Sequence, residues 1–509
     1  MVSASPTANL PRQRGRQRAR PSIRRTTQGF VLLAAACLVF ADFELIALDP
    51  WGELGKILKG AVTPDLSATS DLPMAVARTI ALAVLGVVGA AGVGIALTLV
   101  YRFRPVRLVC AFLRNIHELF WALILMQIFG LTGLTGVLAL VIPYSCIFAK
   151  IYTELLAASD SLPAQSIPGR VGRISRFFYG ELPDTRAQLA IYTAYRLECG
   201  LRAGTIMGFI GLPTLGFHLE TAFSQGAYGQ SWAILFVTFG LIATVRVWFR
   251  LWTVPLLVLA AFAVLPLSSP IELAHIARLL TVDIVPAPLR SGAGLDGLWA
   301  WTVMMFGEQI GPGLANTVIV TQIALVLTGL VGLVALPLAS RHFMGPAGRI
   351  AGHVALVVLR STPEYIIAFI LLLVWGPSML PAVVALALHN GAVVGHLAGR
   401  VSETLGLRDD AAYGVNLYAF EILPRLYSQF LAFLFYRWEV IFRETAILGI
   451  LGIHTLGFYA DSAIAELRLD RAMLIIVVTG LCGVGIETVS RAIRTRLSLS
   501  INIDEAKAS

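Results

Sequence analysis

The residues that could do chemistry in this chain are charged side chains placed inside otherwise apolar segments. Glu198 and Arg202 lie four residues apart in one such segment, and Glu439 and Arg443 repeat the spacing later in the chain. On a helix this spacing puts both side chains on one face, so each pair is expected to form an ion pair that lowers the cost of burial. The favoured interpretation is a structural pair that locks helices together, and the alternative is a direct functional role.

Two further acids have a similar setting. Glu118 and Glu364 each follow an arginine by four residues near the start of an apolar segment. In the first turn of a helix, a carboxylate is stabilised by the positive end of the helix dipole, so no catalytic role is required. A structural role and a functional role both remain open for them.

Other kinds of site are missing from the sequence. There is no HExxH motif and no phosphate-binding GxxxxGK[ST] loop, and no GxSxG motif that would present a nucleophile. We therefore expect no metal, no cofactor and no enzymatic activity, and any energy source must be a separate chain or an ion gradient. The histidines inside apolar segments have no acidic neighbour at ligand spacing, and they are His218, His389, His396 and His454.

The elements that must position these charges occur twice. Residues 195–217 read YRLECGLRAGTIMGFIGLPTLGF, and residues 436–458 read YRWEVIFRETAILGILGIHTLGF, with 11 of 23 positions identical at an offset of 241. Arg114 and Glu118 recur as Arg360 and Glu364 at an offset of 246. The chain is thus interpreted as one unit of roughly 240 residues, duplicated and fused.

Composition sets the class of protein. With 57% hydrophobic and 14% charged residues and a mean hydropathy of +0.78, the chain is expected to be an all-α integral membrane protein. The net charge of +9 is concentrated before the first apolar run and after later ones, which indicates topology and argues against nucleic acid as a partner. Membrane lipid is the expected surrounding. No convincing cleavage site follows the first apolar run, which is therefore expected to be a retained anchor.

About 12 transmembrane helices are predicted, six in each half. The basic loops place both termini in the cytoplasm, and six spans return the chain to its starting side, so the repeat is parallel. The predicted domains are a basic tail (1–28), a first domain (29–250), a second domain (251–496) and a C-terminal tail (497–509). The predicted spans are 29–48, 75–100, 112–131, 133–150, 187–212, 229–249, 251–267, 313–339, 352–375, 379–398, 425–452 and 472–490.

Two long polar loops, 151–186 and 399–424, each end on a Leu-Pro pair. Because proline lacks an amide proton, a short surface helix is expected to stop there before the next span begins. Two equivalent surface helices would suit a cytoplasmic partner. The repeated glycines predict close helix packing or a turn inside the protein, with a solute path as the alternative, and they are Gly208, Gly211, Gly216, Gly449, Gly452 and Gly457.

The second copy of the repeat, together with RSTPEYIIAFILLLVWG and ALALHNGAVVGHLAGRVSE, resembles the permease subunit of phosphonate-type ABC importers. The motif RNIHELFWALILMQIFGLTGLTGVLAL in the first half is similar, so the chain resembles two type I importer permeases fused into one. The resemblance implies a bacterial inner-membrane subunit that imports phosphonate, phosphite or a related organophosphorus anion. It also implies two cytoplasmic ATPase copies and a periplasmic or extracellular solute-binding protein as partners.

The resemblance further implies which residues act. Those that dock the ATPases would be Gly172, Leu182, Pro183, Ala411, Ala412, Gly414, Leu423 and Pro424. The repeat signature would contribute gate and ion-pair residues, namely the six glycines and Arg196, Glu198, Arg202, Arg437, Glu439 and Arg443. The chain departs from the family pattern at Gly200 and Ile441, where an asparagine is usual, and at Arg246, the counterpart of the acid Glu487. The alternatives are a gradient-driven carrier with six-plus-six helices or an ABC permease for another small solute.

Overall fold

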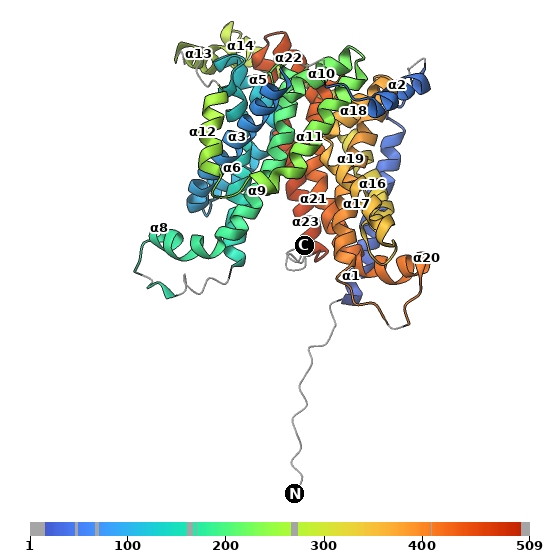
Figure 1. Cartoon of the computed structure of the whole chain (residues 1–509). Coiled ribbons are helices and arrows are strands. Elements are labelled where there is room, and N and C mark those ends of the chain that lie inside the picture. The colour runs from blue at the N-terminus through green and yellow to red at the C-terminus, as the bar shows by residue number, and fades with distance from the viewer. Residues whose placement is uncertain are drawn as a thin grey trace.

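The computed structural model describes residues 16–45, 49–66, 71–159, 166–168, 170–265, 273–408 and 410–499, without the side chains of 16–22, and within these ranges all regular structure is helical (Figure 1). The rest of the two predicted tails lies outside the described residues. The first half contains α1 (Arg16–Leu38), α2 (Pro50–Val62), α3 (Leu72–Val100), α4 (Arg104–Asn115), α5 (Glu118–Phe129), α6 (Gly133–Ala158), α8 (Arg173–Arg176), the π-helical turn η1 (Phe177–Glu181), α9 (Leu182–Ile206), the 3-10 turn η2 (Met207–Ile210), α10 (Leu215–Ser224) and α11 (Tyr228–Trp248).

The second half repeats this order and adds short helices near its start. It contains α12 (Val254–Val264), α13 (Leu273–Arg278), η3 (Leu279–Asp283), α14 (Ala287–Arg290), α15 (Gly294–Met305), η4 (Phe306–Ile310), α16 (Gly311–Ala339), α17 (Pro346–Ser361), α18 (Glu364–Trp375), α19 (Met379–Ser402), α20 (Gly414–Asn416), the π-helical η5 (Leu417–Ile422), α21 (Leu423–Ile450), α22 (Leu456–Ala465) and α23 (Leu469–Arg496). In Figure 1, α8 and α20 lie at one end of the bundle, while α2, α10, α13 and α14 lie at the other.

The twelve predicted membrane-crossing helices are not confirmed by the part of the chain that the structure describes. Among the described residues, six helices are long and apolar enough to cross a membrane, and up to nine spans result if each of three bent helix pairs counts as one. The predicted spans at 29–48, 251–267 and 425–452 are not among them. The helix at 251–267 is only the 11-residue α12, and α21 carries Arg425, Arg437, Glu439, Arg443 and Glu444 along its length.

Two of the bent pairs are equivalent in the two halves. The α4–α5 and α17–α18 pairs each turn by 90°. In the second half Pro363 precedes α18, and the residue before a proline is pushed into an extended conformation, which Thr362 adopts. In the first half His117 takes the place of the proline, and its Nδ1 accepts a hydrogen bond from Leu119 N at 3.1 Å, which caps α5. The sharp bends place the first turns of α5 and α18 inside the bundle.

The halves exchange their first helices. α1 packs against α16 of the second half, where Cys37 joins the core around Val320 and Ile323, and Phe30 O accepts a hydrogen bond from Gln322. α12 packs in turn against α3 of the first half. Because each half supplies part of the other's core, the halves form one folded unit. The boundary at residue 250 remains a prediction about the repeat.

The repeated glycines form a tight helix break in both halves. A Cβ on Gly208 would lie 2.1 Å from Phe217 N, and one on Gly449 would lie 2.1 Å from Phe458 N. Gly211 has φ +96° and Gly452 has φ +86°, in the left-handed region that glycine adopts without strain. The glycines therefore serve both close backbone approach and an internal turn.

The Leu-Pro pairs do not stop a helix, contrary to the prediction. Glu181 and Leu182 both have right-handed helical dihedral angles, and η1 runs directly into α9. Leu182 N donates to Phe177 O, five residues earlier, and Leu423 N donates in the same way to Tyr418 O. The wide π turn allows the helix to continue through the position where proline lacks its amide proton.

Candidate functional site

A cavity of about 260 Å³ lies between the two halves of the chain. The bent starts of α5 and α18 line it, together with the middles of α9 and α21. Its basic side chains are Arg114, Lys150, Arg196, Arg202, Arg437 and Arg443. Its acidic side chains are Glu118, Glu364, Glu439 and Glu444, so its lining has an excess of two positive charges.

Two arginines of this cavity reach across to the other half. Arg202 Nη1 lies 3.3 Å from the backbone oxygen of Arg360, and Arg443 Nη1 lies 2.8 Å from that of Arg114. Both oxygens belong to the last turn of a helix that ends at a bend, α17 or α4, where carbonyl groups lack intrahelical partners. A cation is favoured at that end of the helix dipole, so each contact joins the halves.

This placement corrects the predicted ion pairs. Among the described residues, no carboxylate of Glu198 or Glu439 comes within ion-pair distance of Arg202 or Arg443. Glu198 instead lies 3.8 Å from Arg246. The spacing of four residues put each acid and arginine within reach, but the helix-end carbonyl groups of the opposite half hold the guanidinium groups.

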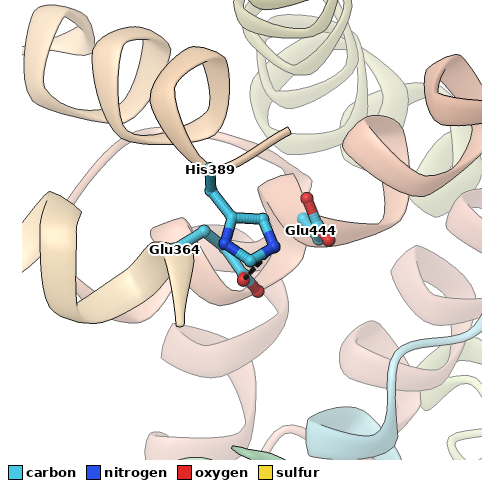
Figure 2. Close-up of side chains that lie close together, drawn as sticks. All are labelled: Glu364, His389 and Glu444. Atoms are coloured by element: carbon cyan, nitrogen blue, oxygen red, sulfur yellow. Dashed lines mark ion pairs between the residues drawn. The ribbon is translucent and has the colours of Figure 1, made fainter. Parts of the chain in front are cut away.

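An acidic cluster with one histidine borders the cavity in the second half (Figure 2). One ligand atom each from Glu364, His389 and Glu444 lies within 4.8 Å of the others. The His389 Nδ1 hydrogen donates to Thr362 O at 2.9 Å, which leaves Nε2 as an acceptor 3.4 Å from Arg202 Nη1. The histidine lone pair thus faces a guanidinium group.

The cluster has no equivalent in the first half. The counterparts of Glu364, His389 and Glu444 at the repeat offsets are Glu118, Pro143 and Ala203. The cluster could not be recognised from the sequence, because its members lie 25 to 80 residues apart. Only folding brings these acids to a histidine that appeared isolated along the chain.

A second cavity of about 1120 Å³ lies next to the first and shares Arg114, Lys150, Ile151 and Tyr436 with it. Arg491 and Arg494 of α23 also line this second cavity.

Glu487 holds together the boundary between the cavities. Its side chain is 3% exposed and is paired with Arg114, with Lys150 at 3.3 Å and with Arg491 at 2.7 Å. Asn115 Nδ2 donates to its other oxygen at 3.3 Å. One acid of the second half therefore anchors two cations of the first half between the two cavities.

The predicted site residues fall into distinct places. Glu118, Glu364, Arg196, Arg202, Arg437, Glu439 and Arg443 line the central cavity. Glu198 and the six repeat glycines line neither cavity. His389, Glu444 and Lys150 were not identified as site residues from the sequence. Only the duplication could have indicated a shared cavity, because it places each half opposite its own copy.

The predicted docking residues lie at the end of the bundle that carries α8 and α20 (Figure 1). Gly172 precedes α8, and Gly414 opens α20 with φ +62°. Ala412, Pro183 and Pro424 are exposed, whereas Ala411, Leu182 and Leu423 are half-buried. Beside Ala411, Arg408 hydrogen-bonds Asp410 and holds the pKa of that carboxyl group below its ordinary value.

The fold and the cavity define a multi-pass helical membrane protein with one internal site built from two repeated halves. The chain is 24% identical over 502 residues to the "Phosphate-import permease protein PhnE" of Mycolicibacterium smegmatis, covering 90% of this chain and 91% of that protein. It is 30% identical over 140 residues to the "Putative phosphite transport system permease protein HtxE" of Stutzerimonas stutzeri, covering 27% of this chain and 54% of the relative. It is also 27% identical over 99 residues to the "Putative cryptic phosphonate transport system permease protein PhnE2" of Escherichia coli K12, covering 19% of this chain and 81% of the relative.

No family profile and no solved structure matches the chain. The relatives confirm the resemblance seen in the sequence, since the chain is similar to permease proteins of phosphonate and phosphite transport. The similarity to the mycobacterial protein extends through both halves, as two fused permease units require.

Proposed function

We propose that this chain is the membrane-spanning subunit of an ABC importer that carries phosphonate, phosphite or a related phosphorus oxyanion across the bacterial inner membrane. Separate ATPase subunits drive it, and a solute-binding protein delivers the anion from outside. The two halves form one path, because both line the same central cavity. Similarity along 90% of the chain to a phosphate-import permease supports the transport class.

The observation that carries the ATPase partnership is a matched pair of exposed apolar surfaces. Ile174 and Tyr179 in the first half are 63% and 80% exposed, and Val415 and Phe420 in the second half are 81% and 79% exposed. The two pairs are related by the repeat offset of 241. Large exposed apolar side chains mark interaction sites, and two matching ones at the same end of the bundle suit two copies of one partner.

This arrangement also favours one orientation. The end with α8 and α20 faces the cytoplasm, where ATP is available, and it carries basic residues such as Arg173, Arg176 and Arg425, as cytoplasmic loops do. Both termini then face the cytoplasm. The opposite end, with α2, α10 and α14, receives the binding protein.

The proposal is tested by co-purifying the chain with candidate ATPase and binding proteins encoded near it. We expect a stable complex whose ATPase activity rises when the loaded binding protein presents phosphonate, phosphite or phosphate. If no ATPase associates and uptake follows an ion gradient, the chain is a secondary carrier instead.

Removing one aromatic residue from each docking surface should separate the ATPase from the chain. Tyr179→Ser combined with Phe420→Ser is expected to weaken ATPase association at least about tenfold, because buried aromatic anchors dominate interface energies at about 2 kcal/mol or more each. Trp51→Ser is the matched control, since Trp51 is 80% exposed on α2 at the other end of the bundle. Association is measured by pull-down at graded ATPase concentrations. An unchanged association in the double variant would place the docking surface elsewhere.

A further inference from the structure

We propose that the central cavity is itself a binding site for a tetrahedral phosphorus oxyanion, held mainly by Arg196 of the first half and Arg437 of the second. These residues are repeat equivalents at the offset of 241, and both line the cavity between the halves. The proposal deepens the proposed function, on which it rests for the identity of the anion. It locates the substrate on its way through the membrane.

The two arginines have spare hydrogen-bond donors. Arg196 stacks on the Tyr144 ring at 4.0 Å, and among the described residues its buried Nε has no hydrogen-bond partner. Arg437 makes one long hydrogen bond, from Nη1 to Asn390 Oδ1 at 3.4 Å. A guanidinium group has five N–H donors, so most of those on both residues remain available to a ligand.

In the described part of the chain, no carboxylate directly neutralises Arg196 or Arg437 of the central cavity. Within the described ranges, none of Arg196, Arg202, Arg437 and Arg443 lies within ion-pair distance of a carboxylate, although four glutamates line the same cavity. By contrast, Arg114 and Lys150 at the edge of the cavity are both paired with Glu487. Cations kept inside a membrane protein without a carboxylate counter-charge indicate a functional site, and the guanidinium fork matches phosphate geometry.

The acidic residues of the cavity suit a site that binds an anion weakly enough to release it during transport. Glu364 and Glu444 lie beside His389 on the second-half side, and Asn390 connects Glu444 to Arg437 by hydrogen bonds. Negative charges close to an anion site weaken its affinity. A permeating ion must bind well enough to enter and weakly enough to leave, so the nearby carboxylates favour release.

The size of the cavity limits the ligand. A volume of about 260 Å³ is below the range of about 300–1,000 Å³ typical of sites for drug-sized ligands. It suits a phosphorus oxyanion with a short organic group, or phosphite and phosphate themselves. An extended organophosphorus molecule would not fit without opening the halves.

The test is a titration of the purified full chain in phospholipid-free detergent with methylphosphonate, phosphite and inorganic phosphate in turn, at constant ionic strength. Arg196→Gln combined with Arg437→Gln is expected to weaken binding at least tenfold. Arg196→Lys combined with Arg437→Lys keeps the charges but loses the guanidinium fork. Its affinity for the anion is expected to lie between those of the unmodified chain and the Gln double variant. Arg250→Gln is the matched control, because Arg250 is exposed and lines neither cavity.

Three results would overturn the site: no saturable binding to the unmodified chain, equal affinity in the Gln variant, or loss of methylphosphonate binding when the chain is placed in phosphatidylcholine nanodiscs. The last result would show that the arginines hold a phospholipid headgroup. The proposed function fails separately, through lack of an ATPase partner. Arginine-dependent binding without an ATPase partner would support the anion site and reject the ABC importer function. Normal uptake by the Gln double variant in an intact importer would support the importer function and reject the anion site.

Discussion

Replacing Glu487 by glutamine is expected to destabilise the protein by about 3–5 kcal/mol, the cost of breaking a buried ion pair. Its carboxylate is 3% exposed and compensates Arg114 and Lys150 of the first half and Arg491 of its own helix. Glutamine keeps the size and part of the hydrogen bonding but leaves Arg114, itself 4% exposed, without a counter-charge. The unfolding midpoint of the purified chain in detergent should fall markedly.

The repeat supplies a matched control for this experiment. Glu198 also contacts an arginine across 3.8 Å, but Arg246 is 81% exposed and Glu198 is 26% exposed. Exposed ion pairs contribute about 0–1 kcal/mol, so Glu198→Gln should change the midpoint little. If both variants melt like the unmodified chain, Glu487 is not the anchor between the halves.

Glu487 also shows which parts of the site could be predicted from the sequence and which could not. The repeat identified its counterpart, Arg246, and hence a break in the symmetry. It could not show that Glu487 meets Arg114, 373 residues earlier in the chain, because that contact depends on how the two halves pack. The asymmetry was visible in the sequence, while its consequence was not.

The charged segments give a similar result. The sequence singled out Arg202, Arg443, Glu118 and Glu364, and all four line the central cavity. Their partners were predicted from helical spacing, which considers one helix alone. In the structure, helix bends expose carbonyl groups of the opposite half, and these compete successfully for Arg202 and Arg443.

The bends within the spans could not be predicted for a related reason. A window of apolar residues does not reveal a bend, and three of the predicted spans are bent helix pairs in the structure. Pro363 signals one bend, but His117 gives the same 90° bend without a proline. The duplication was the reliable signal, since it shows that a feature explained in one half recurs in the other.

Gly216→Ala and Gly457→Ala are each expected to prevent correct folding of the helix bundle. A Cβ at residue 216 would lie 1.7 Å from Thr205 O, and one at residue 457 would lie 2.1 Å from Ala446 O. Both obstacles are backbone atoms, so no side-chain rotation relieves the overlap and α10 or α22 must move away from its neighbour. Overpacked side chains already cost about 1–3 kcal/mol, and separating two backbones should cost more than that.

The control uses an exposed helical glycine that has no close neighbour. Gly240 lies within α11, and a Cβ there would have nothing within 4 Å. Gly240→Ala should therefore stabilise slightly, by about 0.5–1 kcal/mol, because glycine loses more backbone entropy in a helix. Fluorescence-detected size exclusion and thermal unfolding in detergent measure both effects. Monodisperse protein of normal stability from Gly216→Ala would show that α9 and α10 do not approach this closely, and the backbone contact that defines the helix break in both halves would have to be abandoned.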